Sequence, residues 1–195
     1  MLVSGREAIR ILKPVVSGDK QAQRVLRSGL AGAAIATPAG PMYDEQLVRA
    51  LVGRPFVDVS RLVTVCPHGL YISRIARTVE VDASAPWPDL VDALALVPAI
   101  PTLSMALLEV QMTAWDGLPW VATLCGWVVL GGEAQGIRGQ GTTRQRITRQ
   151  GIQGDEAPGR RSFDLRPPGD WFGAFEGRRL PTSRGGRPWY LWTPV

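Results

Sequence analysis

A short stretch near the N-terminus concentrates side chains that donate hydrogen bonds. Within eight residues lie one lysine, two glutamines and two arginines: Lys20, Gln21, Gln23, Arg24 and Arg27. The cationic groups suit phosphate oxygens, and guanidinium and amide groups can also pair with base edges. The chemistry that this cluster predicts is the binding of a nucleic acid.

Residues suited to catalysis are few. His68 is the single histidine, and although Cys66 precedes it by two positions, no further ligand has the spacing of a zinc site. Cys125 lies far along the chain, and the sequence cannot place it beside His68 as a nucleophile pair. The sequence therefore predicts no catalytic residue, no metal site and no cofactor.

Two further patterns also favour structural roles. The glycines around Gly131-Gly132 and Gly136-x-x-Gly139-x-Gly141 lack the lysine and the strand-to-helix setting of a phosphate-binding loop. We interpret them as turns. Three carboxylates are expected on solvated helix surfaces rather than as an acid–base pair: Asp89, Asp92 and Glu109.

Two helices are predicted to position the donor cluster. Ser4 and Glu7 form a capping-box pattern that starts the first helix, and Pro14 ends it. Ser17 or Asp19 is expected to cap the second helix, which carries the donors on its outer face. Its inner face and its end are defined by Ala22, Val25, Leu26 and Gly29.

A third helix follows a short loop. The segment from Ala31 to Gly40 is rich in small residues and is predicted to form a hairpin. Asp44 is a suitable N-cap for a helix whose apolar face is formed by Leu47, Val48 and Leu51, and Gly53 and Pro55 end this helix.

The segment Arg24-Val-Leu-Arg27-Ser28-Gly29-Leu30, a short loop, and Met42-Tyr43-Asp44 opening a leucine-rich helix resemble the MerR and excisionase-type winged helix-turn-helix family. The resemblance covers residues 4–55. It implies that the second helix enters the major groove of duplex DNA and that the loop is a wing. The residues that it would assign to DNA contact are Lys20, Gln21, Gln23, Arg24 and Arg27.

Charge is divided unevenly along the chain. The net charge of +5 is the sum of +6 over residues 1–77, −7 over residues 78–133 and +6 over residues 134–195. The N-terminal part can therefore attract a phosphate backbone, whereas the middle part would be repelled by it. The 20 arginines against two lysines point to a genome rich in G and C, which makes arginine count a weak indicator of function.

Residues 59–195 are predicted to form an α+β domain with a small sheet. Phe56 to Val65 is expected to be a linker or strand. Leu70 to Val81 is expected to form a pair of strands at a sheet edge, with clean alternation from Thr78 to Asp82. Helices are expected at 88–97, 102–115 and 170–178, and the second of them carries Leu103, Leu107, Val110 and Trp115 on one stripe. Strands are expected at 120–130, 162–165 and 188–192. The segment 138–161 is expected to be a flexible arginine-rich loop or a nucleic-acid-binding arm.

Together these features predict a mixed α/β (α+β) protein with a winged helix-turn-helix over 1–58 and an α+β domain over 59–195. We expect a bacterial, cytoplasmic, non-enzymatic transcriptional regulator that binds double-stranded DNA and can form a homodimer. We expect no export signal, because Met1 to Gly5 leads directly into a charged helix, and we expect no membrane span, because the apolar runs are too short or too interrupted. The main alternative is a protein-interaction or assembly module that uses the same helices without DNA. A third possibility is a small enzyme in residues 78–195 that uses His68 or the carboxylates.

Overall fold

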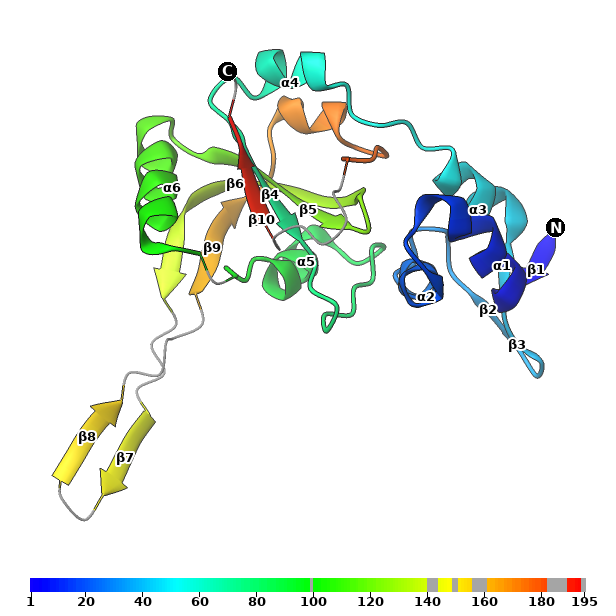
Figure 1. Ribbon diagram of the computed structural model, residues 1–195, viewed down its shortest axis with the longest axis horizontal. Coiled ribbons are helices and arrows are strands. Elements are labelled where there is room, and N and C mark those ends of the chain that lie inside the picture. Colours follow the sequence, from blue (N-terminus) through cyan, green and yellow to red (C-terminus); the bar gives the residue numbers. More distant parts are fainter. Residues whose placement is uncertain (99, 140–143, 149–150, 156–160, 182–188, 194–195) are drawn as a thin grey trace.

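Figure 1 shows a computed structural model of the chain, which describes residues 1–98, 100–139, 144–148, 151–155, 161–181 and 189–193. Helices and strands are both present, and this confirms the predicted mixed α/β class. In the described part of the chain, no helix combines the length and apolar character needed to cross a bilayer.

The first 53 residues, here called the N-terminal unit, form three helices and a three-stranded sheet with the order β1-β3-β2. The elements are β1 (Leu2–Ser4), α1 (Gly5–Leu12), the 3-10 turn η1 (Lys13–Val15), α2 (Asp19–Arg27), β2 (Ile35–Thr37), β3 (Gly40–Asp44) and α3 (Glu45–Val52). The predicted order of helix, helix, hairpin and helix is confirmed, and β1 is an addition that the sequence did not indicate.

Local capping explains most of these boundaries. The Ser4 hydroxyl accepts a hydrogen bond from the Glu7 amide at 3.3 Å, and the Asp44 carboxylate accepts one from the Gln46 amide. Gly29 follows α2 with φ of +75°, a conformation that other residues adopt only with strain. The cap of α2 differs from the prediction, because Gly18 occupies the N-cap position without a side-chain bond.

The C-terminal part is built on a five-stranded sheet with the order β10-β4-β5-β6-β9, in which only β4 and β5 are parallel. The strands are β4 (Leu70–Arg74), β5 (Leu118–Leu124), β6 (Trp127–Gly139), β9 (Arg161–Arg166) and β10 (Trp189–Trp192). Neighbouring residues alternate between faces, so Tyr71 joins one hydrophobic cluster and Ile72 joins another.

Helices cover both faces of this sheet (Figure 1). Residues of α5 (Trp87–Leu94) and α6 (Thr102–Ala114) pack into the cluster that holds Tyr71. Residues of α4 (Val59–Val65) and of the 3-10 turn η2 (Asp170–Ala174), with adjoining positions, pack into the cluster that holds Ile72. The expectation of a linker or strand at 56–65 is wrong over α4, and 78–82 contains no strand.

The apolar stripe predicted on α6 faces away from the core. The buried side chains of the helix are Met105, Leu108 and Met112. Leu103 is 83% exposed and Val110 is 63% exposed. Both sides of this helix are apolar, and only one of them packs on the sheet.

The arginine-rich segment contains paired strands. Strand β6 continues to Gly139, and β7 (Arg144–Thr148) pairs antiparallel with β8 (Gly151–Asp155). The expectation of a flexible loop is therefore wrong for these strands. The other positions of the segment, 140–143, 149–150 and 156–160, lie outside the described residues.

The N-terminal unit is joined to the sheet by several specific contacts. The indole Nε1 of the fully buried Trp127 donates to the Leu51 carbonyl at 3.0 Å, at the end of α3. The Arg179 guanidinium lies 4.6 Å from the Phe56 ring centroid and 4.9 Å from that of Trp127. One hydrophobic cluster includes residues of both parts, so the two parts share a packed interface.

Candidate nucleic-acid interface

Helix α2 presents one row of unpaired donors to solvent. Ala22, Val25 and Leu26 are buried, as predicted, which leaves Lys20, Gln23 and Arg27 exposed at i, i+3 and i+7 on one side. Among the described residues, these three side chains enter no hydrogen bond or ion pair. We call this row, Lys20, Gln23 and Arg27, the α2 edge.

Gln21 stands apart from the α2 edge. Its side-chain Oε1 accepts a hydrogen bond from the Ser17 amide at 3.1 Å, and the residue is half-buried. This bond closes the turn that leads into α2, where a side-chain cap is missing. The structure therefore uses Gln21 to shape the start of the helix.

Arg24 points into the C-terminal part rather than outward. Its guanidinium donates to the carbonyls of Ile75 at 3.1 Å and Val79 at 3.0 Å, and also to that of Ala76. Burial lowers the pKa of this guanidinium, with nearby Arg77 adding to the effect and Cys125 opposing it. The prediction that Arg24 lies on the outward face of α2 is wrong, because the loop after β4 occupies that side.

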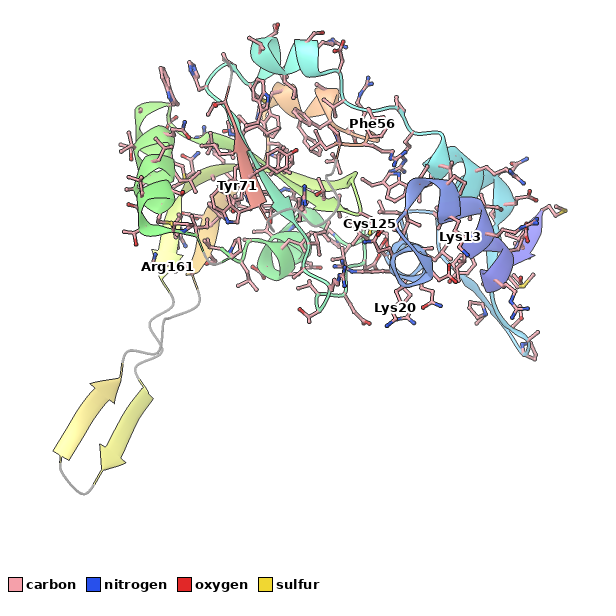
Figure 2. All side chains as sticks on the ribbon, in the orientation of Figure 1. Lys13, Lys20, Phe56, Tyr71, Cys125 and Arg161 are labelled. Atoms are coloured by element: carbon pink, nitrogen blue, oxygen red, sulfur yellow. The ribbon has the colours of Figure 1, made fainter. Side chains whose placement is uncertain are left out.

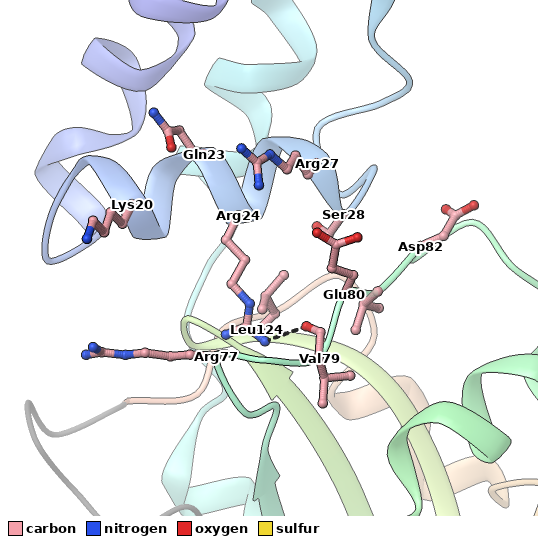
Figure 3. A pocket seen from close by; sticks show the side chains of 11 residues that line it. Lys20, Gln23, Arg24, Arg27, Ser28, Arg77, Val79, Glu80, Asp82 and Leu124 are labelled. Carbon is pink, nitrogen blue, oxygen red and sulfur yellow. Dashed lines mark hydrogen bonds between the residues drawn. The ribbon is translucent and has the colours of Figure 1, made fainter.

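The α2 edge borders a cleft of about 560 Å³ between α2 and the loop that follows β4 (Figure 3). Leu124 lies toward the base, and Arg77, Glu80 and Asp82 come from the opposite wall. Hydrogen bonds from the Ser84 hydroxyl and amide lower the pKa of Asp82, which favours its ionised form. The cleft thus has a cationic side along α2 and a mixed wall opposite.

Arg77 is the residue that the sequence did not suggest for this site. It is exposed and brings a third cation beside Lys20 and Arg27. Its position, 50 residues after Arg27, carried no local signal, because the proximity arises from the packing of the two parts. The two acidic residues close behind it limit the positive potential on that wall.

The β2–β3 hairpin is the element that the resemblance assigns as a wing. Its turn is closed by a hydrogen bond from the Thr37 hydroxyl to the Gly40 carbonyl at 2.7 Å. No basic residue occurs between Ile35 and Asp44. Any contact of this hairpin with a phosphate would therefore use backbone amides, because the Thr37 hydroxyl already donates its proton to the Gly40 carbonyl.

The residues considered for catalysis are dispersed. The His68 ring stacks on Trp115, with centroids 3.6 Å apart, while Cys66 is fully buried under α4. Cys125 is at the other end of the sheet, near the N-terminal unit (Figure 2). Among the described residues, no three of the His, Cys, Asp and Glu side chains are grouped as metal ligands would be.

The two thiols are predicted to differ in reactivity. Burial raises the pKa of Cys66 to about 12, so this thiol stays protonated and shielded at pH 8. Burial also raises the pKa of the half-buried Cys125, but Arg24 and Arg77 oppose that shift. We expect maleimide at pH 8 to modify the native protein once, at Cys125, and twice after denaturation in urea. Intact-mass spectrometry measures this, and native labelling of a Cys125→Ser variant would contradict it.

The chain was compared with models of protein families, with curated proteins and with solved structures, and none of these comparisons finds a match. The resemblance to the MerR and excisionase-type family therefore stays a prediction that rests on the quoted residues.

Proposed function

We propose that the protein binds duplex DNA through the α2 edge and acts as a transcriptional regulator. The observation that carries the proposal is the row of three exposed donors on one helix, each without a partner in the described structure. An α-helix fits the major groove, where lysine and arginine meet phosphates and guanine, and glutamine meets adenine.

The surroundings of α2 support this role. Helix α2 belongs to a compact unit whose neighbouring helices leave its outer edge open, and Arg77 supplies an additional cation. The contacts of Arg24, Trp127 and Arg179 hold the unit against the C-terminal sheet, so this edge has a defined orientation. Glu80 and Asp82 would disfavour phosphates on the far wall, which confines the predicted footprint to α2 and Arg77.

The experiment is fluorescence anisotropy of the full chain with a labelled duplex of random sequence, over a series of salt concentrations. Log affinity should fall linearly with log salt. Lys20→Ala and Arg27→Ala should each weaken binding and reduce the magnitude of the slope by about one.

Arg10→Ala provides the matched control. Arg10 lies on α1 and is highly exposed, and its one partner among the described residues is Glu7 at 2.6 Å, so its removal should leave both affinity and slope unchanged. Absence of binding at low salt, or an equal effect of Arg10→Ala and Arg27→Ala, would argue against the α2 edge as the DNA surface.

The second candidate function is assembly without DNA. The observation that favours it is the exposed apolar side of α6, which is unusual for a surface helix. The two functions depend on different surfaces of the molecule, and substitutions in each surface can therefore separate them.

A further inference from the structure

The outer side of α6 has the pattern of an interface. Leu103, Leu107 and Val110 are 83%, 50% and 63% exposed, and they are spaced by four and then three residues. This is the spacing of a coiled-coil seam, in which apolar side chains of one helix pack between those of another. Exposed neighbours on the same helix include three small residues: Ala106, Thr113 and Ala114.

Charge is nearly absent from α6 itself. Glu109 is the one charged residue among the 13 of α6. At the C-terminal end of the helix, Trp115 is 51% exposed and stacks on the His68 ring, which extends the apolar surface. Depletion of charge and enrichment in aromatic residues distinguish the centres of protein–protein interfaces from ordinary surface.

We propose that this surface, the α6 stripe of Leu103, Leu107, Val110 and Trp115, binds the α6 stripe of a second copy of the chain. The two helices would lie antiparallel about a two-fold axis that passes between positions 106 and 107. Leu103 then faces Val110 of the second copy, and Leu107 faces the small Ala106. An isologous contact of this kind is self-complementary by construction.

The position of Glu109, the single charged residue of α6, is compatible with a second copy of the chain as the binding partner. About the same axis, Glu109 faces Ser104 of the second copy, so the two carboxylates do not oppose each other directly. A parallel pair would bring each Glu109 beside its equivalent. Nothing basic or acidic elsewhere on α6 selects a charged partner.

The exposed area predicts a weak dimer. Burying a Leu or Val side chain completely removes roughly 60–120 Å² of apolar surface, and an aromatic side chain removes more. From the exposed fractions, the four side chains of the α6 stripe contribute roughly 200–300 Å² per copy. Specific interfaces bury at least roughly 500 Å² per partner, so we expect dissociation constants of roughly 10 µM to 1 mM.

The position of α6 sets the geometry of the dimer. Figure 1 shows α6 and the N-terminal unit at opposite ends of the molecule. A dimer through the α6 stripe would therefore carry its two α2 helices at its outer ends. This inference does not depend on DNA binding, because association is measured on the protein alone.

The first test is sedimentation velocity of the full chain without DNA, up to about 1 mM. We expect a concentration-dependent dimer that Leu107→Glu weakens by roughly a hundredfold or more, because two carboxylates would meet at the axis. Val63→Glu is the matched control, since Val63 is also 50% exposed but lies on α4. A monomer throughout the range, or equal effects of the two variants, would overturn the proposal.

The second test is oxidative cross-linking in a Cys125→Ser background. About the proposed axis, two cysteines at position 106 are offset by one residue, roughly 1.5 Å along the helix, and two at position 103 are offset by roughly 10 Å. Ala106→Cys should therefore form a covalent dimer readily and Leu103→Cys should not. The reverse order of reactivity would overturn the antiparallel arrangement.

Discussion

Replacing Trp127 with alanine is expected to lower the free energy of unfolding by about 3–5 kcal/mol. Trp127 is fully buried at the start of β6, directly after the tight turn formed by Cys125 and Gly126. Its indole contacts both parts of the molecule, because Nε1 donates to the Leu51 carbonyl and Arg179 lies over the ring. The substitution removes this hydrogen bond and leaves a cavity at the interface.

Two variants separate the contributions to this loss. Trp127→Phe keeps most of the apolar volume and removes the N–H donor, so we expect a loss of about 1–2 kcal/mol. Trp115→Ala removes a tryptophan that is 51% exposed, and its loss should be at most about 1 kcal/mol. Urea unfolding followed by far-ultraviolet circular dichroism measures all three. Equal losses for Trp127→Ala and Trp115→Ala would show that the interface contact is not stabilising.

Elements defined by local chemistry were predictable from the sequence. The starts of α1 and α3 follow from Ser4 and Asp44, whose side chains accept from backbone amides within a few residues. The expected effect of Pro14 is wrong, because Lys13 keeps helical angles (φ −51°, ψ −38°) and the chain continues through Pro14 as η1. The apolar face of α2 follows from spacing alone. The cap of α4 was also detectable, because Asp58 accepts from the Ser60 amide, but the neighbouring valines favoured a strand.

Features defined by tertiary packing were not predictable. Periodicity cannot decide which side of α6 is buried, since Leu107 on one side and Leu108 on the other are equally apolar. The same limit applies to the candidate site. The pattern of α2 shows that Arg24 and Arg27 lie off the core of the N-terminal unit, but not that the loop after β4 covers one of them.

The structure therefore divides the outer side of α2 between two roles. Arg24, on the inner margin, holds the C-terminal part, and the exposed α2 edge is the surface that we propose for DNA. DNA binding and self-association would use opposite ends of the molecule, so Arg27→Ala and Leu107→Glu should act independently of each other.

Replacing Arg24 with alanine is expected to cost about 2–4 kcal/mol of stability. The guanidinium donates to three carbonyls of the loop after β4, and alanine removes this donor from all three in a partly buried interface. The Ala76 carbonyl still accepts from the Val79 amide, so the loss falls mainly on the carbonyls of Ile75 and Val79. Arg24→Lys should recover less than half of the loss, because an ammonium group cannot reproduce the planar fork of donors. Arg27→Ala, one turn further on the exposed side, should change stability by no more than about 0.5 kcal/mol.

The same pair of variants distinguishes a structural role of Arg24 from direct DNA contact. At temperatures where Arg24→Ala remains folded, its salt dependence of DNA binding should match that of the unmodified protein, because no phosphate contact is lost. Arg27→Ala should reduce the magnitude of the slope by about one while leaving the urea midpoint unchanged. If Arg24→Ala instead reduced the slope and kept full stability, the Arg24 guanidinium of the unmodified protein would have to leave the loop carbonyls and reach the DNA. The arrangement of α2 against the C-terminal part would then differ between the free and the bound protein.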